Sequence, residues 1–401
     1  MYLGGARDRE AILPPCFFYL RGFSVLCIIL SAAFLIHLPS PAFALSPVSE
    51  FNPAVLGDMR DNVFVDANAF FANNVLPMHS IIFNEWNGPF KTENFNPADG
   101  YWKTGAGLVY KGWRVSGFYR GEFFIEGNKD TVEILRMLNL KKELPVGRNF
   151  DVDMNANGFT ATGIEISRGL KLDGILKGLS VGCTARYLKG GKIQVGEISG
   201  NVLPTNQKSY DFNLNIDYVY DKNYLYKRRD QGSFSGEGYS FDLGLQYLLN
   251  DKIALDVLFR DIGGRIYWKN IPYTTADATS DTKSYDEDGY QQFRPTIRGY
   301  ESFKNYTQKI PFKTDVELSY SWEHLKVSST VNLIQDRALY WIDLTYKAAE
   351  GIYIKTGYNT NYKVANIGLI YKNVLLNLYS SDIRLTKADS LGLMASLRYE
   401  W

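Results

Sequence analysis

Histidine is the side chain most often used as a base in hydrolytic sites. The chain has 3 in 401 residues, and two of them, His79 and His324, lie beyond residue 44. His79 is followed directly by Ser80. A nucleophile and its base must meet in space, which adjacency along the chain does not ensure. His324 falls in a predicted turn. We interpret both histidines as solvated loop or turn residues and predict that the chain is not an enzyme.

A second concentration of reactive groups is acidic. Residues 274–290 form a predicted loop that contains Asp277, Asp281, Asp286, Glu287 and Asp288. Carboxylates at this density would suit calcium, but their spacing departs from the twelve-residue calcium loop. We favour a solvated loop and expect no metal and no cofactor.

Charged residues also recur at alternate positions within apolar segments. A ring of one sign would select ions, whereas these residues have both signs. They are therefore compatible either with a water-filled pore that has an internal field or with salt-bridged filling of a closed barrel. The candidates for the inner face of such a barrel are Arg114, Arg120, Glu122, Glu126, Asp211, Asp217, Asp256, Arg260, Asp315 and Glu317.

The segments that carry these charges alternate with a period of two, which is typical of strands with one apolar and one polar face. In residues 209–221, SYDFNLNIDYVYD, aromatic and aliphatic side chains alternate with Asp and Asn. Residues 113–126, 239–249 and 252–261 repeat this pattern, and the two residues Asn250 and Asp251 predict a hairpin between the last two. Further strands are predicted at 62–72, 311–321, 325–334, 338–347, 351–358, 363–371, 373–380 and 391–401.

Together these segments predict an all-β fold, a transmembrane antiparallel up-and-down β-barrel over residues 62–401. Short turns alternate with long connections at 77–100, 127–150, 221–238, 262–310 and 381–390, as periplasmic turns and extracellular loops do. Closure is required because an unpaired backbone amide in hydrocarbon costs several kcal/mol. The count is about 14 to 16 strands, depending on whether Gly190-Gly191 splits a hairpin. A soluble β-sandwich is the alternative fold.

Residues 1–44 have the features of a secretory signal peptide. Basic residues precede the apolar run FSVLCIILSAAFLIHL, and Ala42-Phe43-Ala44 fits a cleavage site. A transmembrane anchor is the alternative, although the run is shorter than the roughly 20 residues of a bilayer span. Cleavage would leave Cys183 as the one cysteine of the mature chain, without an internal disulfide.

Residues 129–144, KDTVEILRMLNLKKEL, predict one helix inside a long loop, with Asp130 and Glu133 at capping-box spacing. We expect it to rest at the barrel mouth or to fold into the lumen. It is interpreted either as a lid or apolar ligand contact, or as a packing element.

The chain ends in LGLMASLRYEW, with apolar residues at alternate positions before a terminal tryptophan. This stretch resembles the C-terminal signal of bacterial outer-membrane β-barrel proteins. The resemblance implies an outer-membrane location among lipid and lipopolysaccharide, and recognition of Leu397, Tyr399 and Trp401 by the barrel-assembly machinery. Trp401 is expected at the periplasmic interface, where amphipathic rings lie.

A second resemblance lies near the N-terminus. Phe51-Asn52-Pro53-Ala54 is similar to the Asn-Pro-Ala segment of the long-chain fatty-acid transporter family, whose N-terminal hatch plugs the barrel. It implies that residues 45–61 form a periplasmic plug segment, with Asn52, Pro53 and Ala54 as plug residues. The same four residues recur at 95–98, in a predicted loop.

The charge balance excludes one class of partner. The chain has 44 basic and 43 acidic residues and no basic block, so nucleic-acid binding is not expected. A barrel of this size encloses more space than side chains alone fill. We therefore predict a porin or a substrate-selective transporter for small molecules, including hydrophobic ones, with a plugged structural or assembly barrel as the alternative.

Overall fold

The structure is a computed structural model that describes most of the chain from residue 52 onwards. The described residues are 52–83, 86, 88–174, 176–206, 209–223, 233–280, 283–285, 291–293, 297–335 and 337–401. The predicted signal peptide therefore lies outside the described residues.

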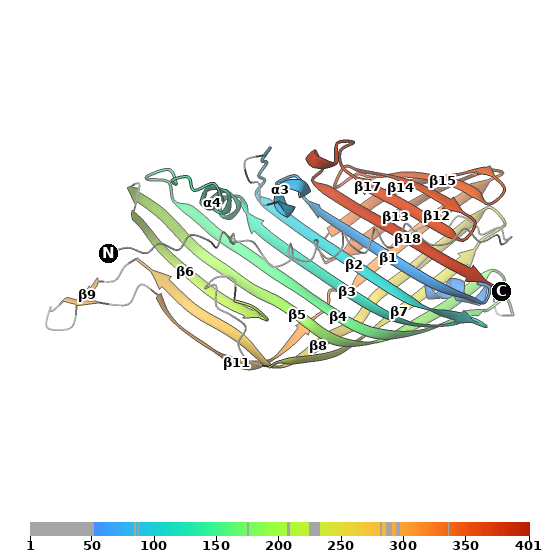
Figure 1. The fold of residues 1–401 in the computed structure, drawn as a ribbon, viewed down its shortest axis with the longest axis horizontal. Coiled ribbons are helices and arrows are strands. Elements are labelled where there is room, and N and C mark those ends of the chain that lie inside the picture. The colour runs from blue at the N-terminus through green and yellow to red at the C-terminus, as the bar shows by residue number, and fades with distance from the viewer. Residues whose placement is uncertain are drawn as a thin grey trace, which may run out of the picture.

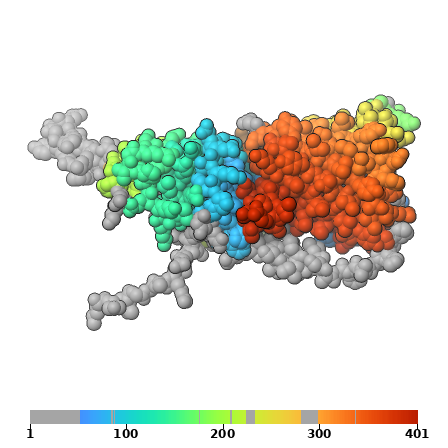
Figure 2. All heavy atoms as spheres, turned by 90° about the horizontal axis from the view of Figure 1, so that it is seen from above, coloured from blue at the N-terminus to red at the C-terminus, as the bar shows by residue number. Residues whose placement is uncertain are grey.

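The predicted barrel is confirmed: 14 antiparallel strands close into a ring. Closure is made by the first and last strands, which pair from Asn62 opposite Glu400 to Ala72 opposite Ser390. Figure 2 shows this junction, where the blue strands lie directly beside the red C-terminal end. The ring consists of β1 (Asn62–Asn73), β2 (Phe95–Tyr110), β3 (Trp113–Asn128), β4 (Phe150–Lys171), β5 (Leu179–Asn206), β7 (Ser235–Leu248), β8 (Ile253–Thr279), β12 (Lys313–Trp322), β13 (Leu325–Ile334), β14 (Arg337–Ala349), β15 (Ile352–Asn359), β16 (Val364–Tyr371), β17 (Val374–Ser380) and β18 (Ser390–Glu400).

Two further strands extend one side of the ring. β6 (Ser209–Tyr220) and β7 pair with successive parts of both β5 and β8. The two strands therefore lie end to end between β5 and β8. β11 (Ile297–Lys309) and β12 likewise follow one another along β8. A small hairpin, β9 (Lys283–Tyr285) with β10 (Gln291–Phe293), projects beyond them (Figure 1).

The barrel consequently has one tall and one short wall (Figure 1). β5 has 28 residues and β17 has 7. At about 3.3 Å per residue, these strands are roughly 90 Å and 23 Å long. The prediction that residues 262–310 form a loop is wrong, because β8 and β11 occupy most of that range. The prediction of a loop at 95–98 is also wrong, because these residues begin β2.

Gly190-Gly191 does not split a hairpin. β5 runs through both glycines, and its pairing with β4 shifts between Thr160 opposite Lys192 and Ala161 opposite Gly190. Gly191 is thus the extra residue of a β-bulge, which bends the strand instead of ending it. The ring therefore has 14 strands, the lower of the two predicted numbers.

The short turns lie at the end of the barrel that carries the C-terminus. The turn between β2 and β3 consists of Lys111 and Gly112, whose φ values are 47° and 75°. Two positive φ angles match the twist of a hairpin, and glycine adopts them without strain. The long connections lie at the opposite end, which the predicted topology makes extracellular.

The outer face is apolar, as the alternation predicts. β16 shows the pattern most clearly: Ile367, Leu369 and Tyr371 are exposed, and the residues between them are buried or intermediate. Tyr110, Trp113, Trp322, Tyr371 and Trp401 are exposed at the ends that carry the short turns. Aromatic rings at this level are typical of a membrane–water interface.

In the part of the chain that the structure describes, four short helical segments accompany the strands: η2 (Pro53–Gly57), α3 (Met78–Ile82), α4 (Lys129–Asn139) and η3 (Leu385–Lys387). Among the described residues, no helix is long and apolar enough to cross a bilayer. The predicted loop helix is confirmed as α4, which lies at the extracellular mouth (Figure 1). Its N-cap is Asn128, not the Asp130 of the predicted capping box: Asn128 Oδ1 accepts from the Thr131 amide at 2.9 Å.

Candidate functional site

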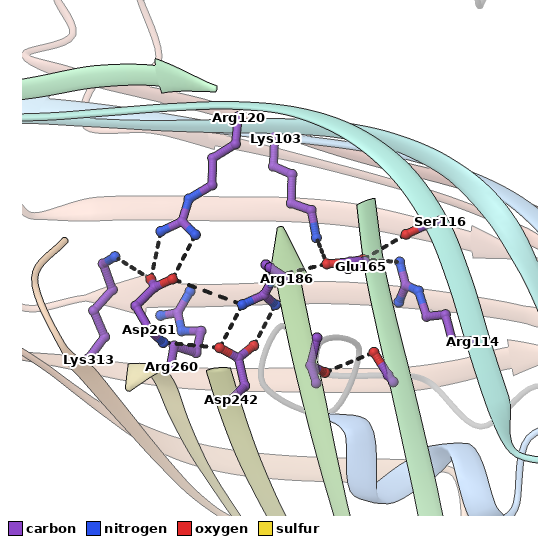
Figure 3. Close-up of polar contacts among 12 residues, drawn as sticks. Lys103, Arg114, Ser116, Arg120, Glu165, Arg186, Asp242, Arg260, Asp261 and Lys313 are labelled. Carbon is purple, nitrogen blue, oxygen red and sulfur yellow. Dashed lines mark hydrogen bonds and ion pairs between the residues drawn. The ribbon is translucent and has the colours of Figure 1, made fainter. Parts of the chain in front are cut away.

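A network of buried charges crosses the barrel interior (Figure 3). The two guanidinium NH2 groups of Arg120 on β3 donate to the Asp261 carboxylate on β8 at 2.7 and 2.6 Å. β3 pairs only with β2 and β4 among the described strands, so this contact passes through the lumen. Lys313 on β12 bridges both sides, 2.8 Å from Glu122 and 3.1 Å from Asp261.

The network continues along the tall wall. Arg186 on β5 contacts Asp242 and lies 2.9 Å from Glu165, which also accepts from Lys103 at 2.7 Å. The members of this charge network are the five cations Lys103, Arg114, Arg120, Arg186 and Lys313 and the five anions Asp66, Glu122, Glu165, Asp242 and Asp261. Because it contains five charges of each sign, the charge network carries no net charge. Because buried charges are costly unless fully paired, the network also holds opposite walls together.

One bulge explains why the network forms. Between the pairs Leu243–Phe259 and Phe241–Ile262, two residues of β8 stand opposite the single residue Asp242. Asp261 has a φ of 59°, which re-aims its side chain. Arg260 and Asp261 therefore both reach interior partners, Asp315 at 2.7 Å and Arg120 at 2.6 Å.

An apolar cluster fills the interior beside the tall wall. Trp268 is 1 % exposed and lies over Gly190 and Gly236, where a Cβ atom would come within 2.6 Å of its ring. Its indole NH donates to Gln308 Oε1 at 3.0 Å, which satisfies its polar atom. The other buried members are Phe118, Phe159, Ala161, Leu188, Ile193, Val219, Ile266, Ile271 and Ile310.

The N-terminal segment packs against the inner wall near the C-terminal end of the barrel. Gly169, Gly182 and Gly244 stand in register on β4, β5 and β7. A Cβ atom on Gly244 would lie 1.9 Å from Asn52 Oδ1, and one on Gly182 would lie 2.3 Å from the Pro53 carbonyl carbon. The row of glycines thus makes the space that η2 occupies.

Asn52 fastens this segment. Its amide NH2 group donates to the Leu245 carbonyl at 2.9 Å and to Asp256 at 3.3 Å, and its Oδ1 accepts from the Ala54 amide at 3.0 Å. Asn52, Pro53 and Ala54 are all buried. The plug role that the resemblance implies for these three residues stays a prediction.

Two cavities lined by described residues lie inside the barrel. The outer chamber, about 350 Å³, lies between the extracellular ends of the tall wall and the β13–β14 turn, and Glu126, Asp217, Lys304, Tyr306 and Gln335 are among its lining residues. The inner chamber, about 190 Å³, lies toward the short wall, with Phe70, Tyr101, Trp341, Tyr362 and Tyr379 in its lining.

Phe124 lines both chambers. On the inner face of β3, it stands between Glu122 of the inner chamber and Glu126 of the outer one. A second contact closes the same level: Arg337 on β14 donates to both oxygens of Asp99 on β2, at 2.6 and 2.8 Å, and Tyr362 donates to Asp99 as well. This Asp99–Arg337 bridge also spans strands that do not pair with each other.

The ten predicted interior charges do not form one cluster. Arg114, Arg120 and Glu122 join the charge network, and Arg260 pairs with Asp315 beside it. Glu126 and Asp217 line the outer chamber, where Asp217 lies 3.8 Å from Lys304. Asp256 bonds Asn52, Glu317 lies 3.7 Å from Lys326, and Asp211 is exposed on β6 beyond these contacts.

Several interior residues were missed by the sequence analysis. Glu165 and Arg186 lie on β4 and β5, for which no clean alternation was recognised. Their signal is present as charges at alternate positions, with Glu165 directly opposite Arg186. Asp261 could not have been found in this way. It follows Arg260, which was predicted to point inward, so strict alternation places Asp261 on the outer face.

The candidates for catalysis and metal binding do not assemble. His79 lies on α3 and packs against Phe83 with ring centroids 4.5 Å apart, while Ser80 is buried. His324 lies in the β12–β13 turn. Asp277 belongs to β8, which corrects its predicted loop position, and Asp281, Asp286, Glu287 and Asp288 lie outside the described residues. No three His, Cys, Asp or Glu side chains among the residues that the structure describes could hold a metal ion.

Comparison with known proteins identifies a family. A model described as a family of unknown function (DUF5723) matches residues 84–386. No curated protein matches the chain.

Solved structures with a similar fold are outer-membrane barrels. A TodX monoaromatic hydrocarbon channel mutant has a TM-score of 0.48 at 10% identity, covering 88% of this chain and 94% of its own. The toluene transporter TodX of P. putida has 0.44 at 10%, covering 87% and 91%. A Pseudomonas aeruginosa FadL homologue has 0.40 at 9%, covering 86% and 91%.

Proposed function

The chain belongs to the family of unknown function DUF5723, and for this member we propose an occluded, substrate-selective transporter of small molecules with hydrophobic parts across the bacterial outer membrane. The proposal is carried by one observation: two chambers lie one after the other in the interior, and a single side chain, Phe124, borders both. A general porin would instead need a continuous water-filled lumen.

The filling of the lumen supports selectivity over free diffusion. The charge network and the apolar cluster occupy the space beside the tall wall, and η2 occupies its lower end. A solute would therefore enter the outer chamber at the extracellular end of the tall wall and continue through the inner chamber beside the short wall. Aromatic rings line the inner chamber, which suits solutes with apolar surface.

The cellular setting is part of the proposal. Residues 1–44 would direct export and be removed, residues 45–61 would form the plug, and residues 62–401 the barrel. The C-terminal residues Leu397, Tyr399 and Trp401 would be read by the barrel-assembly machinery, and the apolar belt would contact outer-membrane lipid and lipopolysaccharide.

A second candidate function, a structural barrel that transports nothing, is favoured by the charge network, because its direct contacts hold opposite walls together. Two measurements separate the candidates. In a Gram-negative host without general porins, the chain should raise the uptake rate of p-cresol above that of the same host without it. In planar bilayers, the purified protein should give no steady open-channel current. Unchanged uptake would favour the structural barrel, and large stepwise currents would favour an open porin.

A further inference from the structure

The inner chamber combines aromatic walls with paired charges. Phe70, Trp341 and Tyr379 meet edge to face, with centroids 5.7 to 6.2 Å apart and interplanar angles of 70° to 85°. A cavity of about 150 Å³ lined by apolar side chains holds one benzene molecule, so the chamber's volume of about 190 Å³ suits a single ring with small substituents.

The charges of this chamber compensate one another. Each of its four acidic lining residues has its own cation: Asp99 with Arg337 at 2.6 Å, Glu122 with Lys313 at 2.8 Å, Asp315 with Arg260 at 2.7 Å, and Asp343 with Lys355 at 3.5 Å. A charged ligand would have to break one of these buried pairs, which is costly. The chamber therefore suits a neutral ligand.

The chamber contains a buried hydrogen-bond acceptor without a partner, Asn366 Oδ1. Asn366 is 3 % exposed, and its amide NH2 group donates to Asp343 Oδ1 at 2.9 Å. This bond crosses Gly357, which stands opposite both residues on β15 and has no side chain to separate them. The bond orients the amide and leaves Asn366 Oδ1 buried without a hydrogen bond. A buried acceptor without a donor is costly, and a ligand donor would remove that cost.

We infer that the inner chamber is a binding site for a neutral, single-ring molecule that carries one hydrogen-bond donor, such as a hydroxyl group. The ring packs against Phe70, Trp341 and Tyr379, and the donor bonds Asn366 Oδ1. Phe124 and the Asp99–Arg337 bridge separate this site from the outer chamber. This inference rests on the proposed function for its biological role, but binding itself does not depend on transport.

The test is titration calorimetry on the purified full barrel in lipid nanodiscs, with p-cresol and p-xylene as probes. The two molecules have nearly the same shape, and only p-cresol has a donor. One neutral hydrogen bond corresponds to a roughly 3- to 10-fold difference in affinity. We expect p-cresol to bind more tightly by this factor in the wild type, and the difference to vanish in Asn366→Leu.

The matched control is Asn377→Leu. Asn377 lies on the neighbouring β17, is 2 % exposed and also has an unpartnered Oδ1, but it does not line the chamber. This variant should keep the preference for p-cresol. Equal affinities in the wild type, an unchanged preference in Asn366→Leu, or an equal loss in both variants would overturn the inference.

A ligand comparison on the wild type covers the case in which Asn366→Leu does not fold. The methyl ether of p-cresol keeps the oxygen and loses the hydrogen-bond donor, so it should bind as weakly as p-xylene. If it bound as tightly as p-cresol, a donor on the ligand would not be what the site recognises, and the inference would be wrong. Failure of the proposed function is distinguishable, because uptake would then be absent from cells while the preference for p-cresol in nanodiscs remained.

Discussion

At the scale of single residues, the interior is held by pairings that no local pattern encodes. Asp261 is the clearest example, since a bulge with a positive φ turns it toward Arg120, 141 positions away in sequence. The inward position of Arg120 and Glu122 follows from alternation along β3, and so could be predicted. Their partners could not, because the contacts across the lumen depend on how the ring closes.

Arg120 should therefore be critical to stability. Replacing it by methionine leaves Asp261 and Glu122, both nearly fully buried, with Lys313 as their main remaining cation. Breaking a buried pair in this way costs about 3–5 kcal/mol. The temperature at which the folded band converts to the unfolded one on a denaturing gel should fall.

The control is Arg148→Met, which removes pairs with Asp130 and Glu133 at the barrel mouth, where the arginine side chain is 40% exposed. Surface pairs contribute about 0–1 kcal/mol, so this variant should convert at nearly the wild-type temperature. Equal shifts in the two variants would contradict the structural role of the charge network.

At the scale of elements, strand positions followed from alternation wherever one face of the strand is apolar and points outward and the other is polar and points into the barrel. β13 was predicted with its exact bounds, and β1 and β12 within two residues at each end. The prediction failed where bulges shift the period, as in β8 at Asp261 and in β5 at Gly191. Alternation also gives no information on η2, because its position depends on glycines more than a hundred residues away.

The glycine row makes the placement of η2 testable. In Gly244→Leu, a side chain would occupy the position of Asn52 Oδ1, so the segment should leave the wall. A cysteine introduced as Val55→Cys, at a buried position of η2 and in a background in which Cys183→Ser removes the exposed native thiol, should then react faster with a water-soluble maleimide. Gly117→Leu is the control, since nothing lies within 4 Å of its added Cβ. Equal labelling in both backgrounds would show that the row does not hold η2.

The closing strand gives a second prediction at this scale. Trp401 lies at the end of β18 and is 62% exposed, so Trp401→Asp should lower the yield of assembled barrel if the assembly machinery reads this residue. Trp322 ends β12 at the same rim and is 57% exposed, which makes Trp322→Asp a matched control with a much smaller effect. Heat-modifiable barrel in isolated outer membranes measures both. An equal loss of assembled barrel in both variants would mean that the tryptophans act as anchors at the membrane interface, and that the assembly machinery does not recognise Trp401.

At the scale of the whole molecule, the barrel is asymmetric inside as well as outside. The tall wall carries the apolar cluster, most of the charge network and η2, whereas the short wall borders the inner chamber. The sequence left open whether mixed charges mean a water-filled pore or a salt-bridged interior. The paired charges favour the second interpretation for the tall side, whereas the inner chamber leaves open space beside the short wall.

The separation of the two chambers by Phe124 is the central element of the proposed function. Phe124→Ala should join them and raise the uptake rate of p-cresol. Phe159→Ala is the matched control: Phe159 is also a buried inward phenylalanine, but it belongs to the apolar cluster and borders neither chamber. Truncating a buried phenylalanine costs about 3–5 kcal/mol, so rates are compared at equal amounts of folded barrel.

The most direct test is the initial rate of p-cresol uptake by porin-deficient cells that carry wild type, Phe124→Ala or Phe159→Ala. The account predicts a faster rate for Phe124→Ala and a wild-type rate for Phe159→Ala. Equal rates for all three, or a rate no higher than that of cells without the protein, would contradict it.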